Sequence, residues 1–192
     1  LMARRPILGR GKRRLATDIG DSAAHRFQCV ALARLLRALG ADTRWRLCLA
    51  ITPDDSLQFP GADFVVGQGE GDLGQRMMRL SDRLAPGPLV FIGSDAPDVV
   101  ADDVATAFET LDRSDAVIGP APDGGYWLIG VTHAQRQHLP FERVRWSTPH
   151  ALADTLENLA GKRVVTLREL EDVDDGASYQ RWRRRLAGRH GK

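Results

Sequence analysis

The chain has 192 residues, of which 43% are hydrophobic and 27% are charged, values close to those of an average globular domain. This composition excludes a disordered chain, a collagen-like chain and a small disulfide scaffold, and no apolar run approaches the roughly 20 residues of a membrane span. The formal net charge of +2 conceals an uneven layout, because residues 1–14 and 180–192 each contain six basic residues and no acid. The middle of the chain is therefore acidic. A basic start and an acidic body are what a site for phosphate and a divalent metal would require, although chance gives such a layout as well.

The length suits one domain, so we expect residues 1–192 to form a single domain in which residues 177–192 are a basic C-terminal helix or tail. No apolar segment follows the basic start as it would in a secretory signal, and we expect a cytoplasmic protein without a membrane span. The histidines are scattered without zinc spacing, and no nucleic-acid-binding motif is present. We therefore expect no nucleic-acid partner.

Helical and strand patterns alternate along the chain. Only residues 1–3 form an apolar run before a glycine-rich turn at residues 6–11, so the first strand is either very short or truncated. In chain order, the patterns then predict a helix over residues 21–39, strands over 47–51 and 63–66, a helix over 72–84, a strand over 89–92, a helix over 99–111, strands over 116–118 and 126–131, a helix over 148–159 capped by Ser147 or Thr148, a strand over 163–167 and a helix over 177–186. Continuous apolar strands between helices indicate an α/β fold, a three-layer α/β/α Rossmann-like sandwich with a mostly parallel sheet. In such sheets, ligands bind at the carboxyl ends of the strands.

The glycine-rich turn is the first candidate site. Gly9 and Gly11 allow the backbone to approach a ligand closely, and the exposed N–H groups of such loops bind phosphate oxygens. Lys12 adds a compact positive charge, and Arg14 adds a planar fork that pairs with two oxygens. The spacing is not that of a Walker A loop. The segment is either a phosphate-binding loop or a solvated basic terminus.

Two acidic segments also follow predicted strands. Asp95 comes directly after the strand over residues 89–92, where a carboxylate can hold Mg²⁺ together with phosphate and water. Asp172 and Asp174 belong to an acidic run near the end of the chain, and their repulsion requires a cation or a proton if they face Asp95 in a cleft. The alternative is that Asp95 is an N-cap or turn residue and that the acidic run is a solvated loop.

Two further glycine-rich segments each allow two interpretations. The first contains Asp123, Gly124, Gly125 and Tyr126. It has the composition of a hairpin turn, whose aromatic side chain either forms the wall of a sugar or base site or packs in the core. The second contains Gly69, Gly71 and Gly74. It opens the helix predicted over residues 72–84, and a helix N-terminus attracts anions.

The order of the motifs is more specific than any one of them. The segments PILGRGKRRLA, QGEGDLGQRM, VFIGSDAP, VIGPAPDGGYWLIGV, VRWST and LEDVDD resemble those of a bacterial family of GT-A-type transferases. These are the radical-SAM/selenodomain-associated transferases, which are related to phospholactate guanylyltransferase. The resemblance covers residues 4–176 and is most specific in GSDAP and GPAPDGGYWLIG.

The resemblance implies a nucleotide-diphospho-sugar transferase fold and a metal-dependent glycosyltransferase that uses a nucleotide sugar and a small-molecule acceptor. One alternative is a nucleotidyltransferase, guanylyltransferase-like, that transfers a nucleoside monophosphate from a nucleoside triphosphate to a phosphorylated small molecule. Another is a non-catalytic nucleotide-binding domain. In each case the nucleotide is expected to lie on the loop after the first strand.

The resemblance also implies roles for single residues. Lys12 and Arg14 match basic positions of a G-x-x-K-T-R-L loop that holds a di- or triphosphate. Asp95 matches a metal-binding aspartate, and Asp174, with Asp172 as the other candidate, would share Mg²⁺ or Mn²⁺ with it.

The remaining candidates are Gly9, Gly11, Gly69, Gly71, Gly74 and Ser94 for the nucleotide, and Gly124, Gly125 and Tyr126 for the acceptor. The candidate catalytic residues are Lys12, Asp95 and Asp123, with Asp123 as the base for a hydroxyl acceptor. The sequence departs from the family pattern at Arg13, Ala96 and Asp175, where Thr, Cys and Thr are usual.

Overall fold

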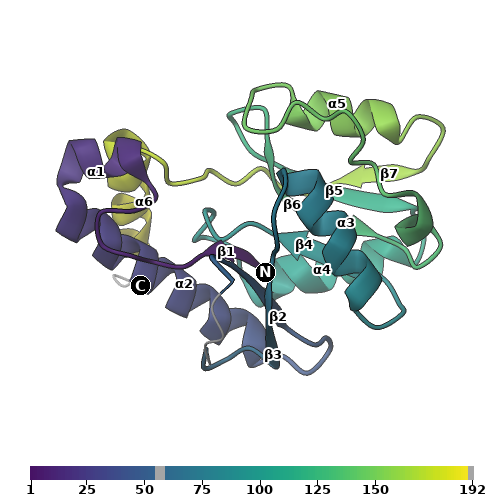
Figure 1. The fold of residues 1–192 in the computed structure, drawn as a ribbon, viewed down its shortest axis with the longest axis horizontal. Coiled ribbons are helices and arrows are strands. Elements are labelled where there is room, and N and C mark those ends of the chain that lie inside the picture. The colour runs from purple at the N-terminus through teal and green to yellow at the C-terminus, as the bar shows by residue number, and fades with distance from the viewer. Residues whose placement is uncertain (55–58, 190–192) are drawn as a thin grey trace.

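The computed structural model describes residues 1–54 and 59–189. The strands are β1 (Met2–Arg4), β2 (Cys48–Thr52), β3 (Phe64–Gly67), β4 (Leu89–Ile92), β5 (Ala116–Pro120), β6 (Tyr126–Val131) and β7 (Val164–Thr166). The helices are α1 (Arg13–Ile19), α2 (Asp21–Gly40), α3 (Leu73–Arg83), α4 (Ala101–Leu111), α5 (Ala151–Asn158) and α6 (Gly176–Arg189), with a 3-10 helix η1 (Gln135–His138). The predicted elements are confirmed in their order, with ends that differ by a few residues, and α1 and η1 are present in addition to them (Figure 1). Residues 190–192 of the predicted basic tail lie outside the described residues. None of the helices in the described ranges is long and apolar enough to cross a lipid bilayer.

Among the described residues, the strands form two sheets, which one isolated bridge connects. β1, β2 and β3 pair in parallel, and a parallel bridge between Met2 and Gly93 joins β1 to the end of β4. Beyond this bridge the strand order is β4-β6-β5-β7. β6 runs antiparallel to both of its neighbours, whereas β5 and β7 are parallel. The α/β fold with a mostly parallel sheet that the sequence predicts is therefore confirmed, with β6 as the reversed strand.

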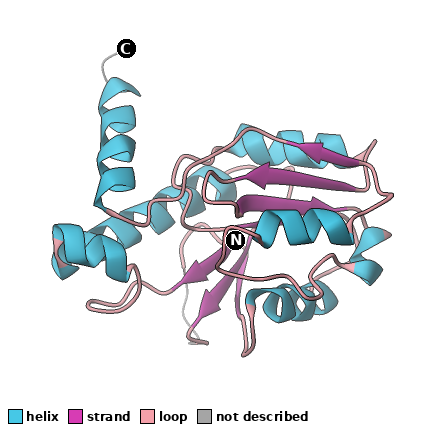
Figure 2. Cartoon of the chain, turned by 90° about the horizontal axis from the view of Figure 1, so that it is seen from above, coloured by secondary structure: helices cyan, strands magenta, loops and turns pink. Residues whose placement is uncertain are grey.

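Alternate residues along the strands enter different cores on the two faces of the sheet. Leu49 and Ile51 of β2 enter the same core as Leu35 of α2, whereas Ala50 between them faces the opposite core. Helices α2 and α4 cover the first face, and α3 and α5 cover the second (Figure 2). Strands that are buried on both sides in this way have the continuous apolar sequences from which they were predicted.

A third, smaller core brings the beginning and the end of the chain together. α1 and α6 pack beside the start of α2 at one end of the molecule (Figure 1). Leu15 of α1 is fully buried there, and Trp182 of α6 is 5% exposed. The Trp182 ring meets the Phe27 ring of α2 edge to face, with 5.0 Å between the ring centroids, a favoured aromatic geometry. The segment after β7 connects this core to the sheet.

Two local features differ from the prediction. The sequence patterns do not predict α1, a helix of seven residues that is stabilised by the burial of Leu15 in the third core. Neither Ser147 nor Thr148 caps α5, because the helix begins at Ala151 with His150 in the N-cap position. Pro149 accounts for this later start, since the residue before a proline is disfavoured in the helical region.

Gly119 lies where β5 passes the buried Trp127 ring. A Cβ atom at Gly119 would lie 2.4 Å from Cε2 of Trp127, and the indole Nε1 of Trp127 donates a hydrogen bond of 3.0 Å to the carbonyl of Arg168. The ring cannot move away without weakening that bond. We expect Gly119→Ala to lower the free energy of unfolding by about 1–3 kcal/mol, as measured by urea denaturation.

Gly188 of α6 provides the control for this substitution, because a Cβ there would meet no atom within 4 Å. We expect Gly188→Ala to be neutral or stabilising, since alanine favours a helix more than glycine does. An equal loss of stability in both variants would contradict the proposed clash with Trp127.

Candidate active site

Asp95 is held at the carboxyl end of β4, in the middle of the sheet. The backbone N–H of Gly93 donates to the carbonyl of Trp127 at 2.9 Å, and the N–H of Ser94 donates to the carbonyl of Met2 at 3.0 Å. These bonds to β6 and β1 fix the turn that follows β4. The side chain of Asp95 is 53% exposed, so its carboxylate remains accessible to a ligand.

The segment after β7 brings the acidic run to Asp95. Its backbone follows β5, where Leu167 N–H donates to the carbonyl of Ile118 at 2.8 Å, and then crosses to β4, where Val173 N–H donates to the carbonyl of Asp95 at 3.0 Å. Val173 is fully buried, which anchors the residues on either side of it. Asp172 and Asp174 are therefore placed beside Asp95 by the fold, although about two fifths of the chain lies between them in sequence.

The loop after β1 turns Lys12 toward the same point. Gly9 and Gly11 have φ angles of 74°, and Lys12 itself has a φ angle of 41° at the N-cap of α1. At Gly11 a Cβ atom would lie 3.0 Å from Nε2 of Gln28, so the close contact with α2 and the left-handed backbone both favour glycine. In the structure these glycines form a turn that aims Lys12 inward, and their predicted contact with the phosphates of a nucleotide remains a prediction.

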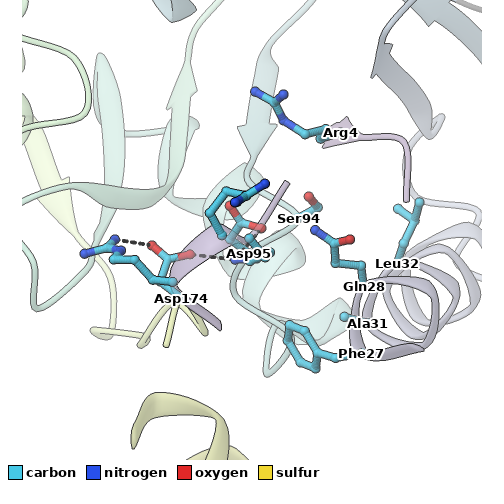
Figure 3. Close-up of a pocket in the computed structure, with 11 residues that line it drawn as sticks. Arg4, Phe27, Gln28, Ala31, Leu32, Ser94, Asp95 and Asp174 are labelled. Carbon is cyan, nitrogen blue, oxygen red and sulfur yellow. Dashed lines mark hydrogen bonds and ion pairs between the residues drawn. The ribbon is translucent and has the colours of Figure 1, made fainter. Parts of the chain in front are cut away.

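Lys12, Asp95 and Asp174 meet in a bridged ion pair. Lys12 Nζ lies 2.8 Å from Oδ1 of Asp95 and 2.7 Å from Oδ1 of Asp174, and the lysine side chain is only 7% exposed. Burial alone would lower the pKa of Lys12, but Asp95 and Asp174 outweigh it and raise that pKa above its ordinary value. Arg14 Nη2 approaches the other oxygen of Asp174 at 3.3 Å. Figure 3 shows Asp95 and Asp174 on the same side of the pocket.

Asp172 is the buried member of the acidic group. Burial, followed by the charge of Asp95 and then that of Asp174, raises the pKa of Asp172 to about 7, against the opposing effect of Lys12. Its Oδ1 atom is buried without a hydrogen-bond partner in the part of the chain that the structure describes. Such a carboxyl group is costly to keep charged unless a cation or a proton compensates it.

A cavity of about 270 Å³ adjoins the bridged ion pair. It is lined by Arg4, Lys12, Arg13, Arg14, Phe27, Gln28, Ala31, Leu32, Ser94, Asp95 and Asp174. Gln28 lies across the cavity from Asp174 (Figure 3). The sequence does not mark Arg4 or Gln28 as site residues, because Arg4 ends a strand and Gln28 lies within a long amphipathic helix, and neither belongs to a local motif.

The segment with Asp123, Gly124, Gly125 and Tyr126 forms the hairpin turn between β5 and β6. Oδ1 of Asp123 accepts a hydrogen bond of 2.9 Å from the N–H of Gly125, and the Asp123 charge contributes to the raised pKa of Asp172. The Tyr126 hydroxyl accepts a hydrogen bond of 3.3 Å from Oγ1 of Thr155 in α5, and burial raises the pKa of this phenol. The Tyr126 hydroxyl is thus directed to α5, and acceptor binding by Tyr126, Gly124 and Gly125 remains a prediction. None of the four residues lines the 270 Å³ cavity.

The loop with Gly69 and Gly71 lies at the carboxyl ends of β1 to β3, but it does not line the cavity. The amide of Gln68 donates to the carbonyls of Ala3 and Ala50 at 2.9 and 2.8 Å, which ties the loop to β1 and β2. Arg79 of α3 donates to the carbonyl of Gln68 at 2.7 Å. Gly74 packs against Phe141 and Trp146, a contact within the core. Nucleotide binding by these glycines remains a prediction.

The carboxylates suit a divalent metal as part of a larger set of ligands. Within residues 1–54 and 59–189, no three His, Cys, Asp or Glu side chains are arranged as a complete metal site. Mg²⁺ usually takes one or two carboxylates and completes its shell with phosphate oxygens and water. Asp95 and Asp174, which already converge on one ammonium group, match that requirement, and the uncompensated Asp172 lies beside them.

A model of the bacterial family DUF2064, described as "Uncharacterized protein conserved in bacteria", matches residues 35–148. No curated protein matches the sequence. Among solved structures, a protein from Desulfovibrio desulfuricans G20, described as a proposed nucleotide-diphospho-sugar transferase, is similar with a TM-score of 0.81 and 28% identity, over 91% of this chain and 80% of that chain.

Two more distant structures share the fold. CMP:2-keto-3-deoxy-manno-octonic acid synthetase in complex with CTP has a TM-score of 0.57 and 15% identity, over 98% of this chain and 97% of that chain. Rv0371c from Mycobacterium tuberculosis H37Rv, in complex with manganese, has a TM-score of 0.52 and 19% identity, over 79% of this chain and 84% of that chain. These structural matches cover more of the chain than residues 35–148, so the similarity of fold is not limited to the region that the family model matches.

Proposed function

Because the chain belongs to the DUF2064 family and places carboxylates and basic side chains around one cavity, we propose that it is a metal-dependent transferase that uses a nucleotide sugar. One observation carries the proposal: Lys12 is held between Asp95 and Asp174 at a cavity that three arginines also line. Basic side chains that neutralise phosphates, next to carboxylates that bind a divalent ion, form the combination that transfer from a nucleotide diphosphate needs. The description of the Desulfovibrio protein and the resemblance to the radical-SAM/selenodomain-associated transferases support the same donor.

In this proposal Lys12 and Arg14 contact the phosphates of the nucleotide, and Ser94 at the end of β4 lies close enough to contribute a hydroxyl donor. Asp95 and Asp174 would hold Mg²⁺ or Mn²⁺, and the manganese complex of Rv0371c is consistent with such an ion. When bound, the ion would neutralise the charge that develops on the departing phosphate. Lys12 and Arg14 would stabilise the same developing charge, because their positive charges are in place before the bond breaks.

The acceptor is proposed to enter from the side of the β5–β6 turn. Asp123 is exposed in that turn and lies close enough to influence Asp172, so its carboxylate is the candidate base for a hydroxyl acceptor. Gly124 and Gly125 would contribute the backbone of the acceptor site. The loop with Gly69 and Gly71, at the carboxyl ends of β1 to β3, is proposed to contact the nucleotide.

A second candidate function is favoured by the charge of the cavity. Four basic side chains line it, against two carboxylates, and this excess suits a triphosphate better than the less charged diphosphate of a nucleotide sugar. The protein would then be a nucleotidyltransferase that releases pyrophosphate. The similarity of the fold to a synthetase in complex with CTP is compatible with this alternative.

One experiment tests the proposal and separates the two donors. The protein is first screened by thermal shift against nucleotide sugars and nucleoside triphosphates, with and without Mn²⁺, because a bound ligand raises the melting temperature. The donors that bind are then incubated with hydroxylated and phosphorylated small molecules, and the released nucleoside diphosphate and pyrophosphate are measured. We expect nucleoside diphosphate from a nucleotide sugar, whereas pyrophosphate would identify the second candidate. Metal-dependent binding with no turnover would indicate a non-catalytic nucleotide-binding domain, and no metal-dependent stabilisation by any nucleotide would contradict the proposal.

A further inference from the structure

The Lys12 ammonium group lies at the point where the two candidate metal ligands converge. Its Nζ atom is within 2.8 Å of an oxygen of Asp95 and of an oxygen of Asp174. Carboxylate oxygens are also the ligands that Mg²⁺ prefers, so the oxygens that now contact the ammonium group are those that would hold the ion. The lysine nitrogen and the metal ion therefore compete for one position.

The backbone conformation at Lys12 directs its side chain to this position. Its φ angle of 41° is uncommon for a residue other than glycine, and it directs the side chain inward from the start of α1. Helix α1 is itself fixed by the fully buried Leu15. A flexible surface lysine would be mostly exposed, whereas the Lys12 side chain is 7% exposed. The ion pair is therefore a product of the fold.

The carboxylates also need a counter-ion when no nucleotide is bound. Asp95 and Asp174 converge beside the buried Asp172, and like charges at such short range repel strongly. To remove Lys12 from this position costs two charge-assisted hydrogen bonds. Phosphate oxygens can replace both carboxylates as partners of Lys12, because an ammonium group donates equally strong hydrogen bonds to phosphate and to carboxylate oxygens.

We propose that Lys12 acts as a built-in counter-ion, which occupies the cation position in the nucleotide-free protein and leaves it when nucleotide phosphates arrive. The divalent metal and the phosphates therefore bind together, and the metal alone binds weakly. This inference rests on the proposed function, and it specifies how binding at that site is ordered. It gives Lys12 two successive partners, the carboxylates and then the phosphates.

Lysine NMR tests the proposal on the unmodified protein. The chain has only three lysines, Lys12, Lys162 and Lys192, so selective ¹⁵N labelling yields three ammonium signals, and the signal of Lys12 is assigned from the Lys12→Arg variant. We expect Mg²⁺ alone to leave the Lys12 signal unchanged, and Mg²⁺ with inorganic pyrophosphate to shift it. A Lys12 signal that shifts with Mg²⁺ alone, or that is unchanged in both conditions, overturns the proposal.

Metal affinity provides a second test. Without nucleotide, we expect Lys12→Met to bind Mn²⁺ at least about tenfold more tightly than the unmodified protein, because the competing charge is gone. Arg13→Met is the matched control: Arg13 lines the same cavity and forms no ion pair with Asp95 or Asp174 in the described chain, so this variant should change Mn²⁺ affinity by less than about threefold. Unchanged or weaker Mn²⁺ binding by Lys12→Met contradicts the counter-ion role.

The two proposals fail in different ways. The proposed function fails if no nucleotide binds in a metal-dependent manner, as calorimetry measures directly. The counter-ion role fails, with the proposed function intact, if a metal–nucleotide complex binds while Mn²⁺ affinity is insensitive to Lys12.

Discussion

Asp95→Asn is expected to weaken Mn²⁺-dependent nucleotide binding by about 100-fold or more, while the protein folds normally. The substitution keeps the shape of the side chain and retains an oxygen that can accept from Lys12, which lies 2.8 Å away, but it removes the charge that attracts a divalent ion. Asp95 is 53% exposed, so the loss of charge costs little stability. Isothermal titration calorimetry with the nucleotide identified by thermal shift measures the effect.

Asp82→Asn is the control for this prediction. Asp82 is an exposed acid of α3, and its substitution removes the same charge away from the cavity. We expect it to bind the metal–nucleotide complex as the unmodified protein does. Equal affinity in Asp95→Asn and the unmodified protein would show that Asp95 is not a metal ligand.

Trp182→Ala is expected to lower the free energy of unfolding by about 3–5 kcal/mol, the largest effect on stability that we anticipate. Trp182 is 5% exposed and contacts both Phe27 and Tyr179, so its removal leaves a cavity between α6 and α2. Since α6 begins just after Asp174, the variant should also bind the metal–nucleotide complex more weakly. Urea denaturation gives the loss of stability.

Trp182→Phe distinguishes the packing of the ring from its polar group. The indole Nε1 of Trp182 is buried without a hydrogen-bond partner among the described residues, so phenylalanine removes no hydrogen bond and relieves an unsatisfied donor. We expect this variant to retain most of the stability that Trp182→Ala loses. A loss below about 1 kcal/mol in Trp182→Ala would mean that the third core contributes little.

Most of the fold could be predicted because its signals are local. The apolar run over residues 89–92 and the helical periodicity over residues 21–39 depend only on neighbouring residues, and both elements are confirmed as β4 and α2. Helix α1 could not be predicted in this way. It depends on the burial of Leu15 against α6, a contact between segments that lie far apart in sequence.

The candidate site could be predicted in part. The rule that ligands bind at the carboxyl ends of parallel strands directed attention to Asp95, and the structure brings Asp174 and Lys12 to it. The sequence did not indicate that the lysine would stand between the two carboxylates, because its direction is set by the left-handed backbone after Gly11. The orientation of the Tyr126 side chain could not be predicted from the sequence either, since it depends on the position of α5.

A crystal structure with Mn²⁺ and a non-hydrolysable analogue of the nucleotide that binds would test the shared position of Lys12 and the metal ion most directly. We expect an anomalous Mn²⁺ peak within bonding distance of carboxylate oxygens of both Asp95 and Asp174, with Lys12 Nζ turned from the carboxylates onto a phosphate. A nucleotide bound with Mn²⁺ elsewhere, while Lys12 still bridges Asp95 and Asp174, would contradict it.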